Sequence, residues 1–214
     1  AICEGMSAGL VPVMTDVGDA GLIVGNISDA GLREARECVN IPVLGLCETS
    51  LHVACMMGAS FGLVTISPKW DLRVRENVQR YRLEHRCAGL EPIETSPIEL
   101  KRAMVDLPFR QGIIDQFNKA AQKLLDKGAE VIIPAGGDII VFLAESKTYE
   151  YQRAPIVNGI VELVKMGEMA AKLRRITGRF TSKRLTYAPP EGDYLKRTRE
   201  FYGAEVYPDA KPVK

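Results

Sequence analysis

Cys47 and Glu48 are adjacent residues whose side chains could act on a small substrate. They follow residues 41–46, IPVLGL, an apolar run that is typical of a buried strand. A thiol at the turn between a strand and a helix can act on one face of a substrate as a nucleophile or as a base. The neighbouring carboxylate could accept a proton or bind an amide N–H group. A free cysteine is also a common small core residue, and packing is the simpler interpretation of Cys47.

Asp29 and Asp138 offer one carboxylate from each half of the chain. Asp29 lies in the polar segment NISD after one apolar run, and Asp138 closes the loop PAGGD after another. A carboxylate can serve as a general base when burial raises its pKa. Each aspartate also precedes a predicted helix, where a side-chain N-cap is the simpler interpretation.

Small hydrogen-bonding residues follow most of the apolar runs. They are typical of a site that binds carboxylate or ureide groups, because such a site needs concave placement and polar partners. Gly136 and Gly137 would let the backbone approach a ligand without a Cβ atom in the way. The predicted substrate-binding residues are Asn26, Ser28, Thr49, Thr65, Ser67, Ala135, Gly136, Gly137 and Asn158.

The apolar runs alternate with segments of helical periodicity, which indicates an α/β fold. Parallel strands joined by right-handed crossovers bring their carboxyl ends to one edge of a sheet. Asn26, Cys47, Thr65 and the 135–137 loop should therefore surround one cleft. No clear strand precedes Gly21. Predicted strands are 21–25, 41–46, 61–65, 88–94, 131–133 and 155–157, and predicted helices are 32–39, 51–57, 72–81, 109–127, 160–175 and a segment after Asp138.

We expect two similar lobes, each with a parallel sheet flanked by helices, and a cleft between them. Residues 1–58 together with 160–214 would form the first lobe and a C-terminal arm, and residues 59–159 the second lobe. The segment from Thr177 onward is basic, aromatic and proline-bearing. It would cover the body of the molecule or a neighbouring subunit.

Composition narrows the class of protein. The chain has 214 residues, 46% of them hydrophobic, which is enough for a sizeable core. Its net charge of +1 creates no field that would attract nucleic acid or a membrane surface. Five cysteines without CxxC spacing and two histidines argue against a disulfide framework and against a zinc site. The expected protein is cytoplasmic and homo-oligomeric, binds a small molecule and uses no cofactor.

Several stretches resemble the aspartate/glutamate racemase superfamily, and within it the hydantoin and allantoin racemases. They include SDAGLREARE from Ser28, IPVLGLCETSLHVA from Ile41, DKGAEVIIPAGG from Asp126 and APIVNGIVELVKMGE from Ala154. The resemblance implies a two-lobed α/β fold and a cofactor-independent reaction. It also implies that one cysteine from each lobe faces the acidic carbon of the substrate, so that one thiol removes a proton and the other returns it.

Both cysteine positions of that family are changed in this chain. By alignment the first falls at Asn26, in VGNISDAGL, and the second at Ala135, in IIPAGGD. Fewer residues precede Gly21 than the resemblance implies, so that either the sequence omits an N-terminal piece or the protein has lost part of the first lobe. We therefore expect an isomerase- or lyase-like enzyme that acts on a small ureide, hydantoin, amino acid or dicarboxylate through other residues, with Cys47, Glu48 and Asp138 as catalytic candidates. The alternatives are a ligand-binding or regulatory homologue and a structural subunit of an assembly.

Overall fold

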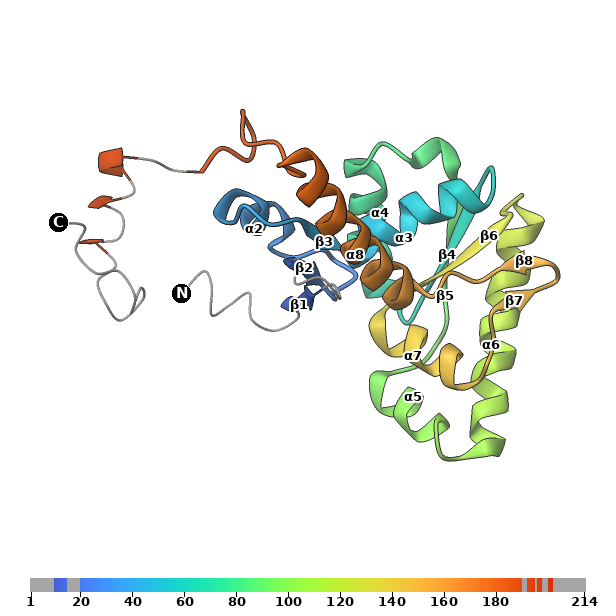
Figure 1. Cartoon of the computed structure of the whole chain (residues 1–214). Helices are drawn as coiled ribbons and strands as arrows, with labels where there is room; N and C mark the ends of the chain where they lie inside the picture. Colours follow the sequence, from blue (N-terminus) through green and yellow to red (C-terminus); the bar gives the residue numbers. More distant parts are fainter. Residues whose placement is uncertain (1–9, 15–19, 190–191, 195, 198–199, 202–214) are drawn as a thin grey trace.

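The protein is built on two three-stranded sheets flanked by helices (Figure 1). The computed structural model describes residues 10–14, 20–189, 192–194, 196–197 and 200–201. The expected α/β class, with parallel strands and flanking helices, is confirmed. The helices are α2 (Leu32–Cys38), α3 (Leu46–Met57), α4 (Pro68–Arg80), α5 (Pro97–Ala103), α6 (Leu107–Asp126), α7 (Gly137–Glu145) and α8 (Gly159–Thr177), with a 3₁₀ turn at Glu84–Arg86.

The first sheet has the order β1-β2-β3. Strand β2 (Ala20–Val24) pairs in parallel with β3 (Val43–Gly45), as the sequence predicts. Strand β1 (Leu10–Met14) was not expected, and it pairs antiparallel to β2, so this sheet is mixed rather than wholly parallel. Pro12 obscures β1 in the sequence. Proline cannot donate to a strand ladder, but it is tolerated in an edge strand such as β1.

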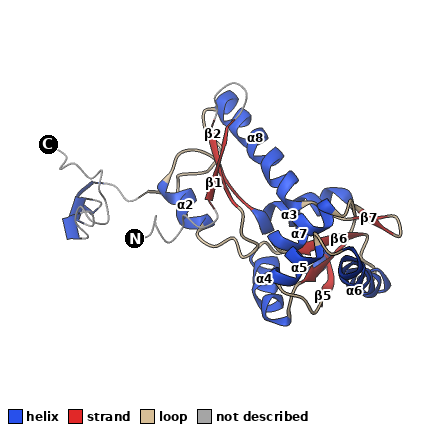
Figure 2. Cartoon of the chain, turned by 90° about the horizontal axis from the view of Figure 1, so that it is seen from below, coloured by secondary structure: helices blue, strands red, loops and turns tan. Residues whose placement is uncertain are grey.

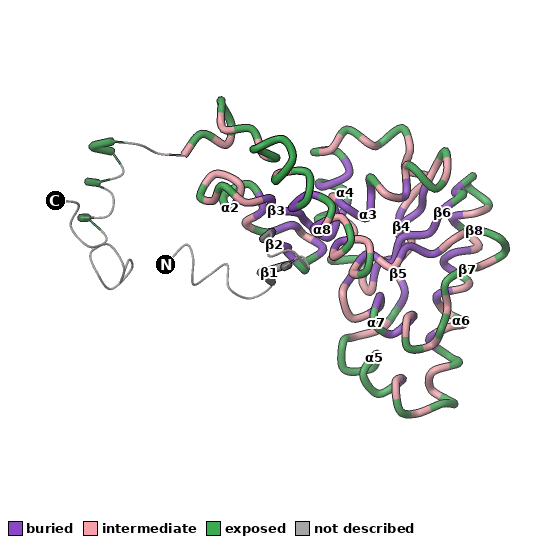
Figure 3. The backbone as a smooth tube through the Cα atoms, viewed as in Figure 1, coloured by how far each residue is buried: buried purple, intermediate pink, exposed green. Residues whose placement is uncertain are grey.

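The second sheet has the order β5-β4-β6, and all its pairings are parallel. Its strands are β4 (Phe61–Thr65), β5 (Cys87–Pro92) and β6 (Val131–Ala135), close to the predicted ranges. Every residue of β4 and β6 is buried (Figure 3). In the register of this sheet Thr65 lies opposite both Pro92 and Ala135. The carboxyl ends of the three strands therefore meet at one edge.

Two elements differ from the sequence prediction. Helix α5 is not among the predicted helices. It begins after Ser96, whose hydroxyl accepts the Glu99 N–H and donates to the Glu99 carboxylate. Residues 155–157 do not extend a sheet. Strand β8 (Ala154–Pro155) instead forms a hairpin with β7 (Glu150–Tyr151), and Ile132 makes one parallel bridge to Ile156. Pro155 lacks the N–H that a central strand would need.

Helix α3 joins the two sheets into one core. Its buried residues Leu46 and Leu51 belong to a cluster that includes Ile23 of the first sheet and Leu63 of the second. Helix α8 packs on α3 and along the first sheet (Figure 2). A Cβ atom at Gly159 would lie 2.4 Å from Ser50 Oγ, so α8 needs a glycine at its start in order to approach α3. The division into lobes at 1–58 with 160–214 and at 59–159 stays a prediction.

The segment after α8 folds back onto helix α2. The Lys183 ammonium donates to the carbonyl oxygens of Glu37 at 3.0 Å and Val39 at 2.8 Å, and also to that of Arg36. Carbonyl groups at the end of a helix have no partners within the helix, so a lysine is stabilising there. The Arg36 guanidinium also lies 5.9 Å from the centre of the Tyr187 ring.

Candidate functional site

A cavity of about 850 Å³ lies where the loops after four strands meet, and we call it the main cavity. Strands β2, β4, β5 and β6 each contribute the residues that follow their carboxyl ends, and α5, α7 and α8 complete the wall. The lining residues are Gly25, Asn26, Ile27, Ile66, Ser67, Trp70, Thr95, Ser96, Pro97, Lys101, Met104, Ala135, Gly136, Gly137, Asp138, Val141 and Ile160.

Asn26 and Ala135, the positions at which the sequence lacks the expected thiols, both line this cavity. Asn26 is held by Ser28, whose N–H and hydroxyl donate to Asn26 Oδ1 at 2.8 and 2.7 Å. The loop after β2 and the start of α7 are near each other, since a Cβ atom on Gly137 would lie 4.0 Å from the Gly25 carbonyl oxygen. The expected convergence of Asn26 with the 135–137 loop is therefore observed.

Among the described residues, Asp138 and Lys101 are the only charged ones that line the main cavity. Asp138 is half-buried in the first turn of α7, where it was expected to be the N-cap. The N-cap is instead Gly136, and no side chain caps this helix. The Asp138 carboxylate is therefore not engaged in capping. Lys101 is exposed, and it makes no ion pair with another described residue.

The remaining wall is divided between polar and apolar groups. The Thr95 hydroxyl is buried and has no hydrogen-bond partner among the described residues, so it is available to a ligand. Ser67 is the N-cap residue of α4, and its side chain makes no capping bond there. The apolar side is formed by Ile27, Ile66, Trp70, Met104, Val141 and Ile160. A ligand with a polar head and an apolar body would match this wall.

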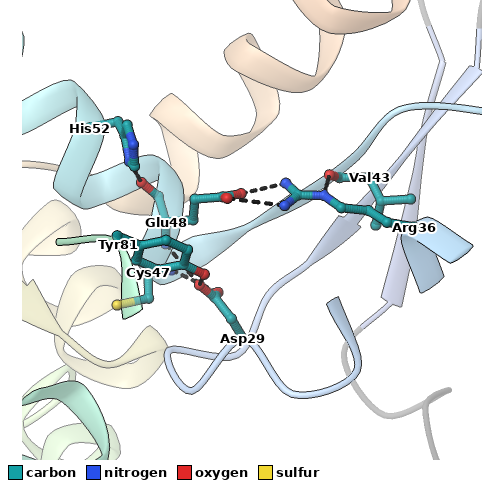
Figure 4. A network of polar contacts seen from close by, with 7 residues as sticks. All are labelled: Asp29, Arg36, Val43, Cys47, Glu48, His52 and Tyr81. Carbon is teal, nitrogen blue, oxygen red and sulfur yellow. Dashed lines mark hydrogen bonds and ion pairs between the residues drawn. The ribbon is translucent and has the colours of Figure 1, made fainter. Parts of the chain in front are cut away.

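Cys47 does not line the main cavity. Its side chain is 1% exposed in the first turn of α3, and burial raises the pKa of its thiol. A buried, protonated thiol is a poor nucleophile. Figure 4 shows Cys47 within a polar network, in which the Cys47 N–H donates to Asp29 Oδ1 at 2.9 Å and the Glu48 N–H donates to Asp29 Oδ2 at 2.8 Å.

Asp29 is a helix cap, but of α3 rather than of α2 as expected. It also accepts the Tyr81 hydroxyl at 2.9 Å, and it has a left-handed backbone with φ of 52°. The carboxylate is 3% exposed, and this burial raises its pKa to about 6 despite the three hydrogen bonds. The Asp29 carboxylate can come this close to the start of α3 only because residue 45 is a glycine, since a Cβ atom there would lie 2.5 Å from Asp29 Oδ1.

Glu48 is bound by Arg36 and does not line the main cavity. Arg36 Nη1 donates to Glu48 Oε1 at 3.0 Å, and Arg36 Nε donates to the Val43 carbonyl at 2.9 Å (Figure 4). The ion pair joins α2 to α3, and the hydrogen bond to Val43 joins α2 to the first residue of β3. The carboxylate is therefore fixed in a structural contact, and the predicted catalytic use of Glu48 has no support from its position.

Four predicted binding residues also lie away from the main cavity. Thr49 is buried within α3, and Thr65 is buried with its hydroxyl bonded to Asp71. Asn158 caps α8 by accepting the Val161 N–H at 3.3 Å. Ser28 lines a separate cavity, although it holds Asn26. Sequence reasoning missed Lys101, Trp70 and the hydroxyl of Thr95. Lys101 and Trp70 lie in α5 and in the first turn of α4 rather than at a strand end. Thr95 lies in the loop after β5, where the sequence does not show that its hydroxyl lacks a partner.

Two other kinds of feature are absent from the described residues. No group of three or more histidine, cysteine, aspartate or glutamate side chains is placed to hold a metal ion in this part of the chain. Within the same residues, no helix combines the length and the apolar character that crossing a membrane requires.

Comparisons with known proteins place this geometry in context. A family model described as Asp/Glu/Hydantoin racemase matches residues 9–167. Hydantoin racemases of Pseudomonas sp. (strain NS671) and Rhizobium meliloti are 29% and 27% identical over 176 and 175 residues, which cover 82% and 78% of this chain. The chain spans only 64% and 65% of the length of those two proteins.

Solved structures of allantoin racemases share the fold. The enzyme from Klebsiella pneumoniae superposes with a TM-score of 0.65 at 24% identity, covering 80% of this chain and 65% of that one. The enzyme from Pseudomonas fluorescens, described as AllR, gives 0.67 at 21% identity, covering 80% and 68%. At these identities the comparison concerns the arrangement of the elements.

Proposed function

Because the chain belongs to the Asp/Glu/Hydantoin racemase family, we propose that it is an isomerase- or lyase-type enzyme for a small hydantoin-like, ureide, amino-acid or dicarboxylate substrate. The main cavity is the proposed substrate site. The observation that carries the proposal is the convergence of Asn26, Ala135 and Asp138 on one cavity at the carboxyl ends of the strands. The relatives whose names include hydantoin or allantoin favour a cyclic or open ureide within this range.

Asp138 is the proposed proton acceptor. No other carboxylate of the described residues lines the main cavity, and Asp138 follows Ala135 by three residues, on the side where the family position has lost its thiol. An ionised carboxylate can remove a proton from a carbon next to a carbonyl group. Lys101 and the Thr95 hydroxyl would bind the carbonyl or carboxylate oxygens on which negative charge develops.

Asn26 would bind the opposite face of the substrate without exchanging a proton. An amide can donate and accept hydrogen bonds, but it is not an acid or a base near neutral pH. A single base on one face removes and returns the proton on that same face. We therefore expect exchange of the substrate proton with solvent to be faster than inversion of the carbon.

The test is exchange in deuterated water. A panel of 5-substituted hydantoins, allantoin, amino acids and dicarboxylates is incubated with the protein, proton NMR follows the acidic C–H, and chiral chromatography follows inversion. Asp138→Asn should slow exchange by about 10²-fold or more. Glu145→Gln is the matched control, because Glu145 is exposed at the far end of the same helix and does not line the cavity. Equal rates in the Asp138→Asn variant and the parent would refute Asp138 as the base.

A second candidate is a ligand-binding homologue without turnover. It is favoured by one observation, which is that none of the cysteines among the described residues lines the main cavity. Calorimetry with the same panel separates the two functions. Saturable binding that Lys101→Met weakens, with no exchange for any bound compound, would establish the binding protein and exclude the enzyme for that panel.

A further inference from the structure

A second cavity, of about 330 Å³, lies between α2, α4 and the loop of residues 25–31, which we call the β2–α2 loop. We call it the arginine cavity, since three of its lining residues are arginines. It is separate from the main cavity, and the two have no lining residue in common. Its charged lining residues are Arg33, Arg73, Arg80, Asp29, Glu34 and Glu76.

The three arginines are not engaged in ion pairs within the described part of the molecule, although three carboxylates line the same cavity. Arg33, Arg73 and Arg80 are exposed and form no ion pair with a described residue, Glu34 and Glu76 at the same rim included. The third carboxylate, Asp29, is occupied by N–H groups and a hydroxyl on its inner side. The guanidinium N–H groups are therefore available to a bound oxyanion, which would accept charge-assisted hydrogen bonds from them.

We propose that the arginine cavity binds a small multivalent oxyanion, and that binding there acts on the main cavity. Guanidinium groups bind carboxylate and phosphate oxygens in pairs, so three of them suit an anion with several oxygens. The volume lies at the lower end of the range for small-molecule sites. It would admit inorganic phosphate, or a phosphate or polycarboxylate with a small organic body.

The β2–α2 loop connects the two cavities. Residues 25–27 line the main cavity, and residues 28–31 line the arginine cavity. Two contacts cross between them, because Ser28 donates to Asn26 and the Asn77 amide donates to the Ile27 carbonyl at 3.2 Å. Asn77 is 2% exposed, so it is fixed in the core of α4. An anion that draws the arginines together would therefore shift residues that line the main cavity.

Calorimetric titration with inorganic phosphate and with citrate tests the site itself at low ionic strength, with sodium chloride as the ionic-strength control. The parent protein should bind at least one of them saturably, and the comparison of the two shows whether phosphate or polycarboxylate chemistry is preferred. Arg73→Gln with Arg80→Gln should weaken binding by about tenfold or more, because two charge-assisted contacts are lost. Arg75 lies on the same helix but outside the cavity, so Arg75→Gln should leave the affinity for the anion within about twofold of the parent's.

The effect on the main cavity has its own reporter. Trp70 is the only tryptophan of the chain, and it lines the main cavity. Its fluorescence should change with the same midpoint as the calorimetric binding, and the change should disappear in the double-arginine variant. No saturable binding, or binding that the double variant retains, would overturn the site. Binding without a fluorescence change would overturn the coupling. Neither readout uses turnover, so the outcome is independent of the proposed reaction.

Discussion

The segments that follow β3 and β6 have the same sequence pattern but opposite environments. Each is an apolar strand followed by small or polar residues and a helix. After β3, Cys47 and Glu48 are enclosed, with their N–H groups bound to Asp29. At the end of β6 and directly after it, residues 135–138 line the main cavity, and no side chain caps α7. The second segment is therefore the one that can receive a ligand.

The difference arises from what covers each helix. Helix α3 lies between the two sheets, packs on α8 and has an acidic cap supplied by the β2–α2 loop. Helix α7 begins at the carboxyl end of β6, where the main cavity lies. A reactive residue type such as cysteine is thus a weaker marker of a site than a strand end whose polar groups have no partner in the protein.

Restoring both thiols should have the largest effect. Asn26→Cys together with Ala135→Cys places two thiols on the main cavity, which would supply an acid and a base on opposite faces of the substrate. We expect inversion of a hydantoin or allantoin substrate to rise by roughly 10³-fold over the parent. Chiral chromatography measures the inversion.

Each single substitution is the control for this double variant. With one thiol, exchange should rise while inversion stays slow, because one face still lacks a proton donor. If the double variant inverts the substrate no faster than the single variants, the two positions do not face a common substrate.

The second prediction concerns pH and the enclosed segment. Asp29 has a pKa of about 6 in the folded protein against 3.8 for an ordinary aspartate, so the folded state holds a proton that the unfolded state has already lost. The free energy of unfolding should therefore fall as pH rises from 3.8 to about 6, and the Asp29 contribution should be constant above that. Across this pH window the free energy of unfolding should fall by about 3 kcal/mol because of Asp29.

Urea unfolding of the parent and of Asp29→Asn across this range measures the effect. The stability difference between the two proteins should change with pH only within the window, because the asparagine does not titrate. A difference that is constant between pH 3.8 and pH 6 would show that Asp29 is not perturbed by burial.

A third prediction tests how closely the cap approaches α3. Gly45→Ala would place a Cβ atom 2.5 Å from Asp29 Oδ1, so the carboxylate must move away from the Cys47 and Glu48 N–H groups. We expect a loss of about 2 kcal/mol in the free energy of unfolding. Gly112→Ala is the control, because nothing lies within 4 Å of its Cβ position in α6, and it should be neutral or stabilising by up to about 1 kcal/mol. Equal effects at the two glycines would contradict this account of the cap.

The sequence predicted the strands of the two sheets better than the residues of the site. Apolar runs located β2, β3, β4 and β6, since a buried parallel strand must be apolar on both faces. Strand β5 was also located, although it is only half-buried. The apolar runs also placed Asn26 and residues 135–137 at one cavity. Cys47 and Thr65 were placed at the same edge, but periodicity does not show that both side chains contact residues of α4. The cap from Asp29 to α3 spans 18 residues, and local patterns carry no signal for such a contact. Lys101 lies in a short helix without apolar periodicity, so its approach to the cavity depends on tertiary packing.

The smallest expected effect is that of Cys47→Ala, and it decides between the two segments directly. Cys47 is enclosed, so its removal should cost about 1 kcal/mol of stability through lost packing and leave the rate of proton exchange within about twofold of the parent. Asp138→Asn, compared in the same assay, should lose exchange while keeping the parent's stability, because Asp138 is half-buried and caps no helix.

The Cys47 thiol should also resist alkylation in the folded protein and react only in urea, since burial raises its pKa. The opposite pair of results, with exchange lost in Cys47→Ala and kept in Asp138→Asn, would mean that the segment after β3 opens in solution and that a single thiol performs the chemistry.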